Sequence, residues 1–305
     1  MNNKETYHIP VLVNEVIEYL QPKPNGVYLD VTFGGGSHTR AILAAEPTCK
    51  VYALDWDRTA IEMNAIPLAE EYPDRFFYFF GNFAHLQRLA KKFDFPQFDG
   101  ILADFGTSQF QIFNKEGMSF ATDTALDMRM SAEHFTKTAA DMVNFASEDE
   151  LLNIFFNYGQ EPRSKAAVRA ILEYRKTKKF KTTKQLIDCI VPALNYPRSN
   201  THPATRIFQA LRIAVNKELE AIETFLKVAP DHIKPQGHLV CISFHSLEDR
   251  IVKQSFAMDE RLQVLTKKVI TASEEELKVN PSSRSAKLRA AERVIQSVKE
   301  AKKSR

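Results

Sequence analysis

Residues 30–38 read Asp-Val-Thr-Phe-Gly-Gly-Gly-Ser-His, and this stretch decides the fold. It closes an apolar run of strand length, residues 27–33, and it opens a helical pattern over residues 38–45. Three glycines between a strand and a helix let the backbone approach a ligand closely, because no Cβ atoms stand in the way. The dinucleotide fingerprint G-x-G-x-x-G is incomplete, since Thr39 occupies the place of the third glycine. The stretch therefore predicts a ligand-binding loop after a first strand, although a tight turn without a ligand is the alternative.

Strand-length apolar runs alternate with helical patterns beyond this loop. The further strands are expected at residues 51–55, 76–80, 100–104 and 239–244, and helices at residues 59–70 and 246–256. Alternation of this kind predicts an α/β fold with a parallel sheet and helices on both faces. Right-handed crossovers then place the loops after the strands along one edge, where ligands bind in such sheets.

The pattern becomes purely helical in the middle of the chain. Helical segments are expected at residues 148–158, 163–175 and 183–194, and a long helix at residues 204–229. We therefore expect residues 1–122 and 204–292 to form the α/β domain. Residues 123–203 would form an all-helical insertion, and residues 293–305 a flexible basic tail.

Charge is distributed unevenly along the 305 residues, although the formal net charge is only +3. Residues 163–184 hold nine Lys and Arg against one acid, and residues 261–305 hold twelve against five. Two basic segments on an otherwise acidic chain favour a polyanionic partner such as nucleic acid, and solvated helix faces are the alternative. The three cysteines lack metal-site spacing, and no run reaches the ~18 apolar residues that a membrane span needs. We expect a cytoplasmic protein with no metal site and no membrane contact.

Chemically useful side chains stand where the predicted strands end. Asp55 closes the second strand, 19 residues after Gly36, and could accept hydrogen bonds from ribose hydroxyls. This combination predicts an adenosine-containing cofactor, either NAD or S-adenosylmethionine. Phe83 follows the third strand and could pack on adenine, although core packing is as plausible. Asp104 ends the fourth strand and is the candidate catalytic residue, because it could polarise an attacking amine or hold a cationic cofactor group.

Several long motifs occur together in one order. They are His8-Ile-Pro-Val-Leu, residues 30–38, Asp99-Gly-Ile-Leu-Ala-Asp-Phe-Gly106, Leu126-Asp-Met-Arg-Met130, residues 202–216, Ile242-Ser-Phe-His-Ser-Leu-Glu-Asp-Arg250 and residues 280–289. From His8 to Arg293 the chain resembles the bacterial 16S ribosomal RNA cytosine-N4 methyltransferases, the RsmH/MraW family. It departs from the family's usual pattern at Ser37, Gln109, Phe110 and Glu116.

The resemblance implies a class I, Rossmann-like methyltransferase sheet with a helical insertion. It implies N4-methylation of a cytidine in the decoding centre of 16S ribosomal RNA, with S-adenosyl-L-methionine as cofactor. The partner would be 16S ribosomal RNA or the small ribosomal subunit, and a homodimer stays open. By resemblance, the cofactor contacts fall on Gly36, Ser37, His38, Asp55, Phe83, Asp104 and Gln111.

Three further residues are candidates for binding the RNA substrate. Arg129 and Arg212 could contact phosphates, and His245 follows the fifth strand at the ligand edge. Each could instead be structural, the arginines through pairing with a nearby acid. Two other functions remain as alternatives, an NAD-dependent oxidoreductase and a non-catalytic RNA-binding or ribosome-assembly factor that keeps the methyltransferase fold. The incomplete glycine fingerprint disfavours the first of these.

Overall fold

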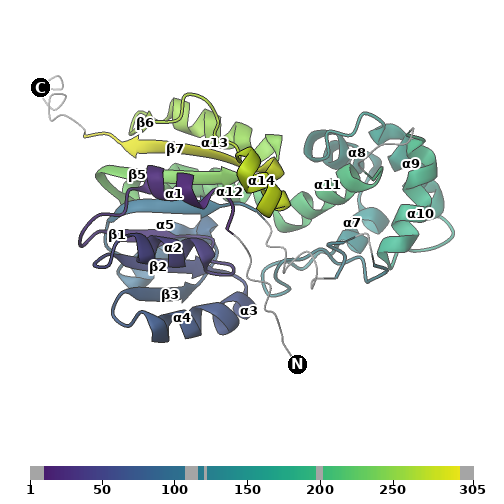
Figure 1. The fold of residues 1–305 in the computed structure, drawn as a ribbon. Coiled ribbons are helices and arrows are strands. Elements are labelled where there is room, and N and C mark those ends of the chain that lie inside the picture. Colours follow the sequence, from purple (N-terminus) through teal and green to yellow (C-terminus); the bar gives the residue numbers. More distant parts are fainter. Residues whose placement is uncertain (1–9, 107–115, 120–121, 197–201, 296–305) are drawn as a thin grey trace, which may run out of the picture. The chain divides into compact units, whose positions relative to one another are not determined.

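The computed structural model describes residues 10–106, 116–119, 122–196 and 202–295 (Figure 1). The chain divides into two compact units. Unit 1 comprises residues 1–106 and 219–305, and unit 2 comprises residues 107–218. Among the described residues, no helix is long and apolar enough to cross a membrane.

Unit 1 is built on a seven-stranded sheet with the order β3-β2-β1-β4-β5-β7-β6. The strands are β1 (Val27–Asp30), β2 (Lys50–Asp55), β3 (Phe76–Phe80), β4 (Phe98–Asp104), β5 (Ile233–Ser243), β6 (Leu262–Val264) and β7 (Lys287–Arg293). The first five pair in parallel, whereas β7 runs antiparallel to both β5 and β6. The five strands expected from the sequence are confirmed, and the α/β fold class with them. The sequence reasoning did not anticipate β6 and β7.

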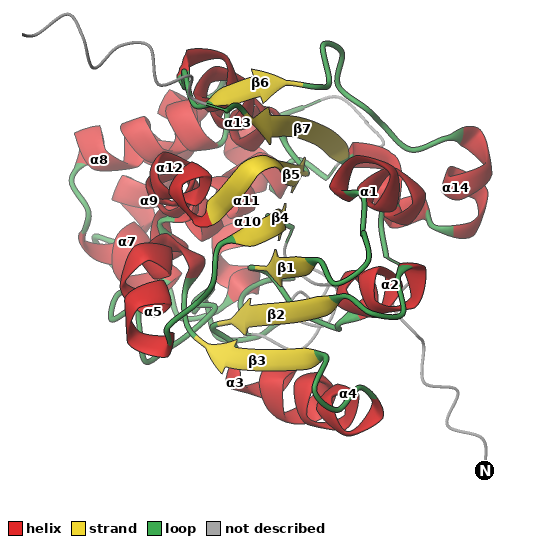
Figure 2. Ribbon diagram, turned by 90° about the vertical axis from the view of Figure 1, so that its left-hand side faces the viewer, coloured by secondary structure: helices red, strands yellow, loops and turns green. Residues whose placement is uncertain are grey.

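Helices cover both faces of this sheet (Figure 2). One face packs against α1 (Val13–Leu20), α2 (Ser37–Ala45) and the helical stretch formed by α3 (Arg58–Ala60), a π-helical turn (Ile61–Ala65) and α4 (Ile66–Glu71). The other packs against α5 (Leu86–Phe93), α12 (Glu218–Val228) and α13 (Ser246–Met258). Successive strand residues serve the two faces in turn, because side chains alternate along a strand. Tyr28 belongs to the first core and Leu29 to the second, and both are fully buried. A short α14 (Glu274–Val279) precedes β7.

Unit 2 is helical. It contains α7 (Ala139–Phe145), α8 (Glu148–Asn153), a π-helical turn (Ile154–Tyr158), α9 (Ser164–Tyr174), α10 (Thr183–Leu194) and α11 (Thr205–Asn216) around its own apolar core. Thr138, Ser147 and Thr182 cap three of these helices through reciprocal capping boxes, which satisfy amides that a helix start leaves without partners. The helices expected in the insertion are thus present in the structure.

The prediction of one long helix over residues 204–229 is wrong, because the structure has two helices there, α11 and α12. The backbone of Lys217 adopts the left-handed conformation, with φ of 50°, and its amide donates to the Ile213 carbonyl. Helix α11 therefore ends at Asn216 and α12 starts afresh. Contacts place α11 with the helical unit, so the observed boundaries lie at residues 107 and 219, where the sequence suggested 123 and 204.

Candidate functional site

The loop after β1 is shaped by two glycines with positive φ. Gly34 has φ of 51° and Gly36 has φ of 75°, conformations that favour glycine. The amide of Gly36 donates to the Phe33 carbonyl over 2.8 Å, which closes the turn just before α2. A Cβ atom at Gly36 would lie 2.7 Å from the Phe33 ring, whereas one at Gly35 would meet no atom within 4 Å. The loop therefore combines a fixed turn with open space beside Gly35, as a cofactor cradle requires.

Asp55 joins this loop to the end of β2. Its Oδ2 accepts a 2.7 Å hydrogen bond from the Gly34 amide, and its Oδ1 accepts one of 2.8 Å from the Asp57 amide. Burial raises the pKa of Asp55 to about 6, against the lowering effect of these two amides. Each carboxylate oxygen has two lone pairs and uses one of them here. Asp55 can therefore accept from two ribose hydroxyls while it holds the loop.

Asp104, at the end of β4, faces the start of α2. Its own amide donates to the Thr32 hydroxyl over 2.7 Å, and its Oδ1 accepts from the Gly106 amide over 3.1 Å. Its Oδ2 lies 3.8 Å from His38 Nδ1. His38 Nε2 lies 2.8 Å from the Val11 carbonyl oxygen, which can only accept, so Nε2 carries a proton and donates it. This contact leaves Nδ1 as the ring nitrogen that faces the Asp104 carboxylate.

Three carboxylates, those of Asp30, Asp55 and Asp104, lie near this edge, and Asp30 raises the pKa of both of the others. Burial, with a smaller contribution from the nearby Asp30, raises the pKa of Asp104 to about 6, against the lowering effect of His38. Asp30 is itself buried, its pKa is raised by burial, and its Oδ2 accepts from the Thr39 hydroxyl over 2.7 Å. A cationic ligand would relieve this repulsion and desolvation. The edge therefore fits a cofactor that carries both a ribose and a positive charge, such as S-adenosylmethionine.

Phe83 stands at the end of β3, in a short 3₁₀ turn (Phe83–His85) capped by the Asn82 side chain. Its ring is half-buried, with its centroid 5.8 Å from that of Phe105 and 5.6 Å from that of Phe225. Packing of this kind fixes the ring while part of it stays exposed. Phe83 thus packs against the second core of the sheet, and stacking on adenine stays a prediction. Gln111, the remaining expected cofactor contact, lies outside the described residues.

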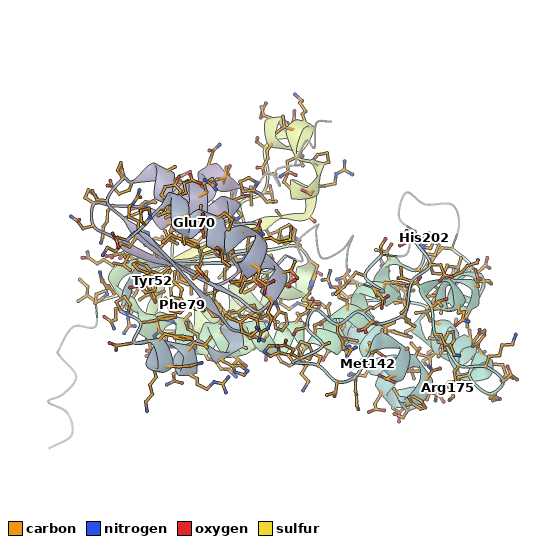
Figure 3. The ribbon with its side chains drawn as sticks, turned by 90° about the horizontal axis from the view of Figure 1, so that it is seen from below. Tyr52, Glu70, Phe79, Met142, Arg175 and His202 are labelled. Carbon is orange, nitrogen blue, oxygen red and sulfur yellow. The ribbon has the colours of Figure 1, made fainter. Side chains whose placement is uncertain are left out.

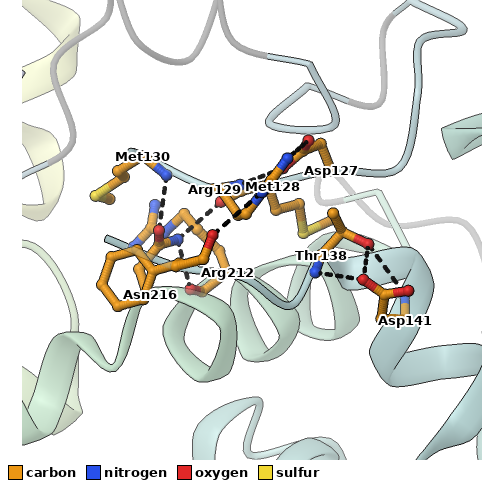
Figure 4. Close-up of polar contacts among 9 residues, drawn as sticks. Asp127, Met128, Arg129, Met130, Thr138, Asp141, Arg212 and Asn216 are labelled. Carbon is orange, nitrogen blue, oxygen red and sulfur yellow. Dashed lines mark hydrogen bonds and ion pairs between the residues drawn. The ribbon is translucent and has the colours of Figure 1, made fainter. Parts of the chain in front are cut away.

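Both candidate RNA-binding arginines pair with acids inside unit 2. Arg129 forms two 2.7 Å bonds with Asp127, from Nε to Oδ1 and from Nη2 to Oδ2, beside Asn216 (Figure 4). Arg212 binds Glu218 in the same bidentate way, with both distances 3.0 Å. Each arginine is therefore paired with an acid, which was the alternative to phosphate binding. A phosphate would have to compete with a carboxylate for each guanidinium.

His245 is the N-cap of α13, and its Nδ1 accepts from the Glu248 amide over 3.4 Å. Its Nε2 lies 3.0 Å from Glu248 Oε1, while Glu248 Oε2 accepts from the Phe244 amide over 2.7 Å. Asp249, in the same first turn, pairs with Arg289 of β7 over 2.6 Å. His245 therefore has a structural task at the start of α13, at the same edge of the sheet as Asp104.

Comparison with known proteins identifies the family. The model described as the MraW methylase family matches residues 5–294. This chain belongs to the MraW methylase family. Relatives named ribosomal RNA small subunit methyltransferase H include one from Nostoc punctiforme, 47% identical over 293 residues, covering 94% of each chain. Another, from Carboxydothermus hydrogenoformans, is 42% identical over 310 residues and covers 95% of this chain and 99% of the relative.

Solved structures similar to this MraW methylase are distant in sequence. TrmN from Thermus thermophilus is 12% identical with a TM-score of 0.47, covering 96% of this chain and 51% of that chain. A ribosomal RNA methylase from Streptococcus thermophilus is 11% identical with a TM-score of 0.43, covering 94% and 99%. Family membership confirms the predicted methyltransferase class and S-adenosylmethionine as the cofactor, which excludes the NAD-dependent alternative.

The sequence reasoning missed several residues that support the site of this MraW methylase. The Thr32 hydroxyl accepts from the backbone amide of Asp104, and the carbonyl of Val11 accepts from His38 Nε2. Asn64 Nδ2 donates to the Gly34 carbonyl over 3.1 Å from the helical stretch before α4. The spacing Asp30-Val-Thr32 does signal a local turn, because an Asp side chain often binds the amide two residues later. The other contacts join segments distant in sequence and leave no local signal.

Proposed function

We propose that this chain transfers a methyl group from S-adenosylmethionine to N4 of a cytidine in the decoding centre of 16S ribosomal RNA. The observation that carries the proposal is the placement of Asp55 and Asp104 beside the Gly34–Gly36 turn in a chain of this family. The relatives' shared name supports ribosomal RNA of the small subunit as the substrate.

The residues of the edge divide the binding of the cofactor. Asp55 accepts from the ribose hydroxyls, and Phe83 offers the accessible part of its half-buried ring to the adenine. When bound, S-adenosylmethionine supplies an electrophilic methyl group on a positively charged sulfur. Gly36, Ser37 and His38, at the start of α2, would contact the cofactor by resemblance, and so would Gln111. Asp104 and Asp30 supply negative charge, which stabilises a cation in a poorly solvated place.

The target amine is a poor nucleophile, because its lone pair is delocalised into the cytosine ring. Alignment of the two reactants can supply roughly 7–11 kcal/mol of the acceleration. Asp104 is the candidate catalytic residue at this edge. Its first role is to hold the cationic part of the cofactor, because three clustered carboxylates favour a cation. Its second is to accept a hydrogen bond from the N4 amine as the methyl is transferred.

RNA binding falls to unit 2 and the basic segments. Residues 163–184 and 261–305 carry the excess positive charge and would neutralise phosphates. Arg129, Arg212 and His245 remain proposed substrate contacts, the arginines in exchange with their carboxylate partners. The target cytidine would have to be unpaired or flipped to reach the edge. We expect this chemistry to take place in the cytoplasm.

Methyl transfer from labelled S-adenosylmethionine to purified small subunits and to free 16S ribosomal RNA tests the proposal. Digestion to nucleosides and mass spectrometry should identify N4-methylcytidine from the wild type and none from Asp104→Ala. Asp99→Ala, at the opposite end of β4, is the matched control and should retain transfer where it folds. A methyl group on another nucleoside would overturn the proposed target. Cofactor binding without any methylated nucleoside would instead favour the non-catalytic RNA-binding factor.

A further inference from the structure

We propose that single-stranded RNA docks on one surface of unit 2, with a base stacked on Phe145 and phosphates on Lys178, Lys179 and Lys181. These four residues are called the α9–α10 surface, because the lysines lie between those two helices. The inference rests on the proposed function, in that the RNA is the ribosomal substrate. It identifies a surface that holds this substrate away from the sheet edge with Asp55 and Asp104.

An exposed aromatic ring is the first observation. Phe145 is the last residue of α7, and 71% of its surface is exposed, whereas Phe155 and Phe180 of the same unit are buried. The Nζ atom of Lys179 lies 4.8 Å from the centre of the Phe145 ring. A ring held at a surface beside a cation is the arrangement on which unpaired bases stack, because every base has a π face.

Charge is the second observation. Lys178, Lys179 and Lys181 are all exposed, and none pairs with a carboxylate in the part of the chain that the structure describes. The flanking lysines differ, since Lys176 pairs with Glu173 and Lys184 with Asp188. Three neighbouring ammonium groups without counter-charges repel one another, and a phosphate backbone would relieve that repulsion.

The segment that carries these lysines is held firmly. Arg175, which is labelled on unit 2 in Figure 3, donates from Nη1 to the carbonyls of Val143 and Ala146, at 3.2 and 2.7 Å, and so caps the end of α7. Asn144 exchanges two 2.9 Å hydrogen bonds with the backbone of Phe180. These contacts tie the lysine segment to the helix that ends in the exposed ring. A surface ordered before binding loses less conformational entropy when it binds.

A neighbouring groove is the less suitable place for phosphates. It encloses about 540 Å³ between α8 and α9, and it is lined by Lys165, Arg169 and Lys176 together with Glu148, Glu173, Leu152 and Leu172. Three basic and two acidic side chains leave the groove with little net charge. It is therefore less complementary to phosphates than the α9–α10 surface is. The exposed ring also favours a single strand over a duplex, whose base faces are covered by stacking.

Binding of a labelled single-stranded oligonucleotide from 16S ribosomal RNA, with a hairpin of equal length for comparison, tests the inference. Phe145→Ala should weaken single-strand binding about five-fold or more and change hairpin binding much less. The triple variant Lys178→Glu, Lys179→Glu and Lys181→Glu should lower the slope of log affinity against log salt by about two, at about 0.7 for each phosphate contact on a single strand. Both changes are at exposed positions, so the fold should tolerate them.

Matched controls remove the same groups elsewhere. Phe156→Ala deletes another exposed ring of unit 2, 63% exposed, and Lys91→Glu with Lys92→Glu reverses two exposed charges on α5 of unit 1. Both controls should bind like the wild type. Equal single-strand affinity and equal salt slope in test and control variants would overturn the inference. If a thermal melting curve shows that the triple variant is not folded under the assay conditions, the result for Phe145→Ala alone decides.

Methyl transfer to small subunits by the same variants separates this inference from the proposed function. A wild type that methylates, with test variants that bind and methylate equally well, contradicts the α9–α10 surface alone. A wild type that transfers no methyl group contradicts the proposed function, while the binding comparison still decides where RNA is held.

Discussion

Replacement of Asp104 by Asn should stabilise the protein without cofactor and weaken cofactor binding at the same time. The upward shift of the Asp104 pKa, from 3.8 to about 6, corresponds to a cost on the order of 3 kcal/mol for the ionised form. The folded state therefore binds the proton more tightly than the unfolded chain. Stability falls as the pH rises through the window between these two values, and the cost is complete above it.

Asparagine removes this cost and keeps the shape. Its Oδ1 can still accept from the Gly106 amide, and its Nδ2 would take the place of the oxygen that faces His38 Nδ1. Loss of the charge should weaken the bond from Gly106 by about 1 kcal/mol, so the net gain at about pH 8 is about 1–2 kcal/mol. In thermal unfolding this is an increase of about 2–8 °C in Tm. Calorimetric titration should show at least about ten-fold weaker binding of S-adenosylmethionine, or about 1.4 kcal/mol.

Asp99, at the other end of β4, provides the opposite control. Its burial raises the pKa, but bonds from Lys23, Lys234 and the Val27 amide outweigh this, and the net pKa is lowered. Its ionised form therefore stabilises the fold above its ordinary pKa, so Asp99→Asn should lower Tm at about pH 8. An Asp104→Asn protein that is less stable than the wild type at that pH, or that binds the cofactor equally well, would refute the reasoning.

Three further changes test other parts of the account. Gly36→Ala places a Cβ atom 2.7 Å from the Phe33 ring at φ of 75°, so it should cost about 1–3 kcal/mol in denaturant unfolding and weaken cofactor binding. Asn216→Ala removes three hydrogen bonds of 2.7–2.9 Å to the backbone of residues 128, 130 and 212, of which the first two are buried. The expected loss in unfolding free energy is about 2–4 kcal/mol, and a loss below about 0.5 kcal/mol would count against it. Cofactor affinity should fall as the pH drops below the Asp104 pKa of about 6, because protonation removes the charge that holds the cation, and a flat pH profile would argue against that contact.

The sequence sufficed for features that depend on neighbouring residues. Five parallel strands and the helices between them follow from runs of apolar residues with the period of a strand or a helix. The placement of Gly36, Asp55 and Asp104 at one edge then follows from topology alone, because parallel strands end on the same side. The pairing of Arg129 with Asp127 could also be predicted from the sequence, since the two residues are two positions apart.

Features that depend on distant contacts escaped the sequence analysis. Strand β7 contains four charged residues in seven and does not look apolar, yet Arg289 is buried there because it pairs with Asp249. The break at Lys217 has no glycine or proline, and the Asn216 beside it is bonded to Met128 and Met130, nearly 90 residues earlier. The surroundings of Asp104 escaped for the same reason, as Thr32 binds it from 72 residues away.

A crystal structure of the complex with S-adenosylhomocysteine tests the central claim most directly. The account predicts the ribose hydroxyls within hydrogen-bond distance of Asp55, the adenine beside Phe83, and the amino-acid portion close to Asp104. A nucleoside bound elsewhere, or an Asp55 carboxylate that contacts only the Gly34 and Asp57 amides in the complex, would contradict it.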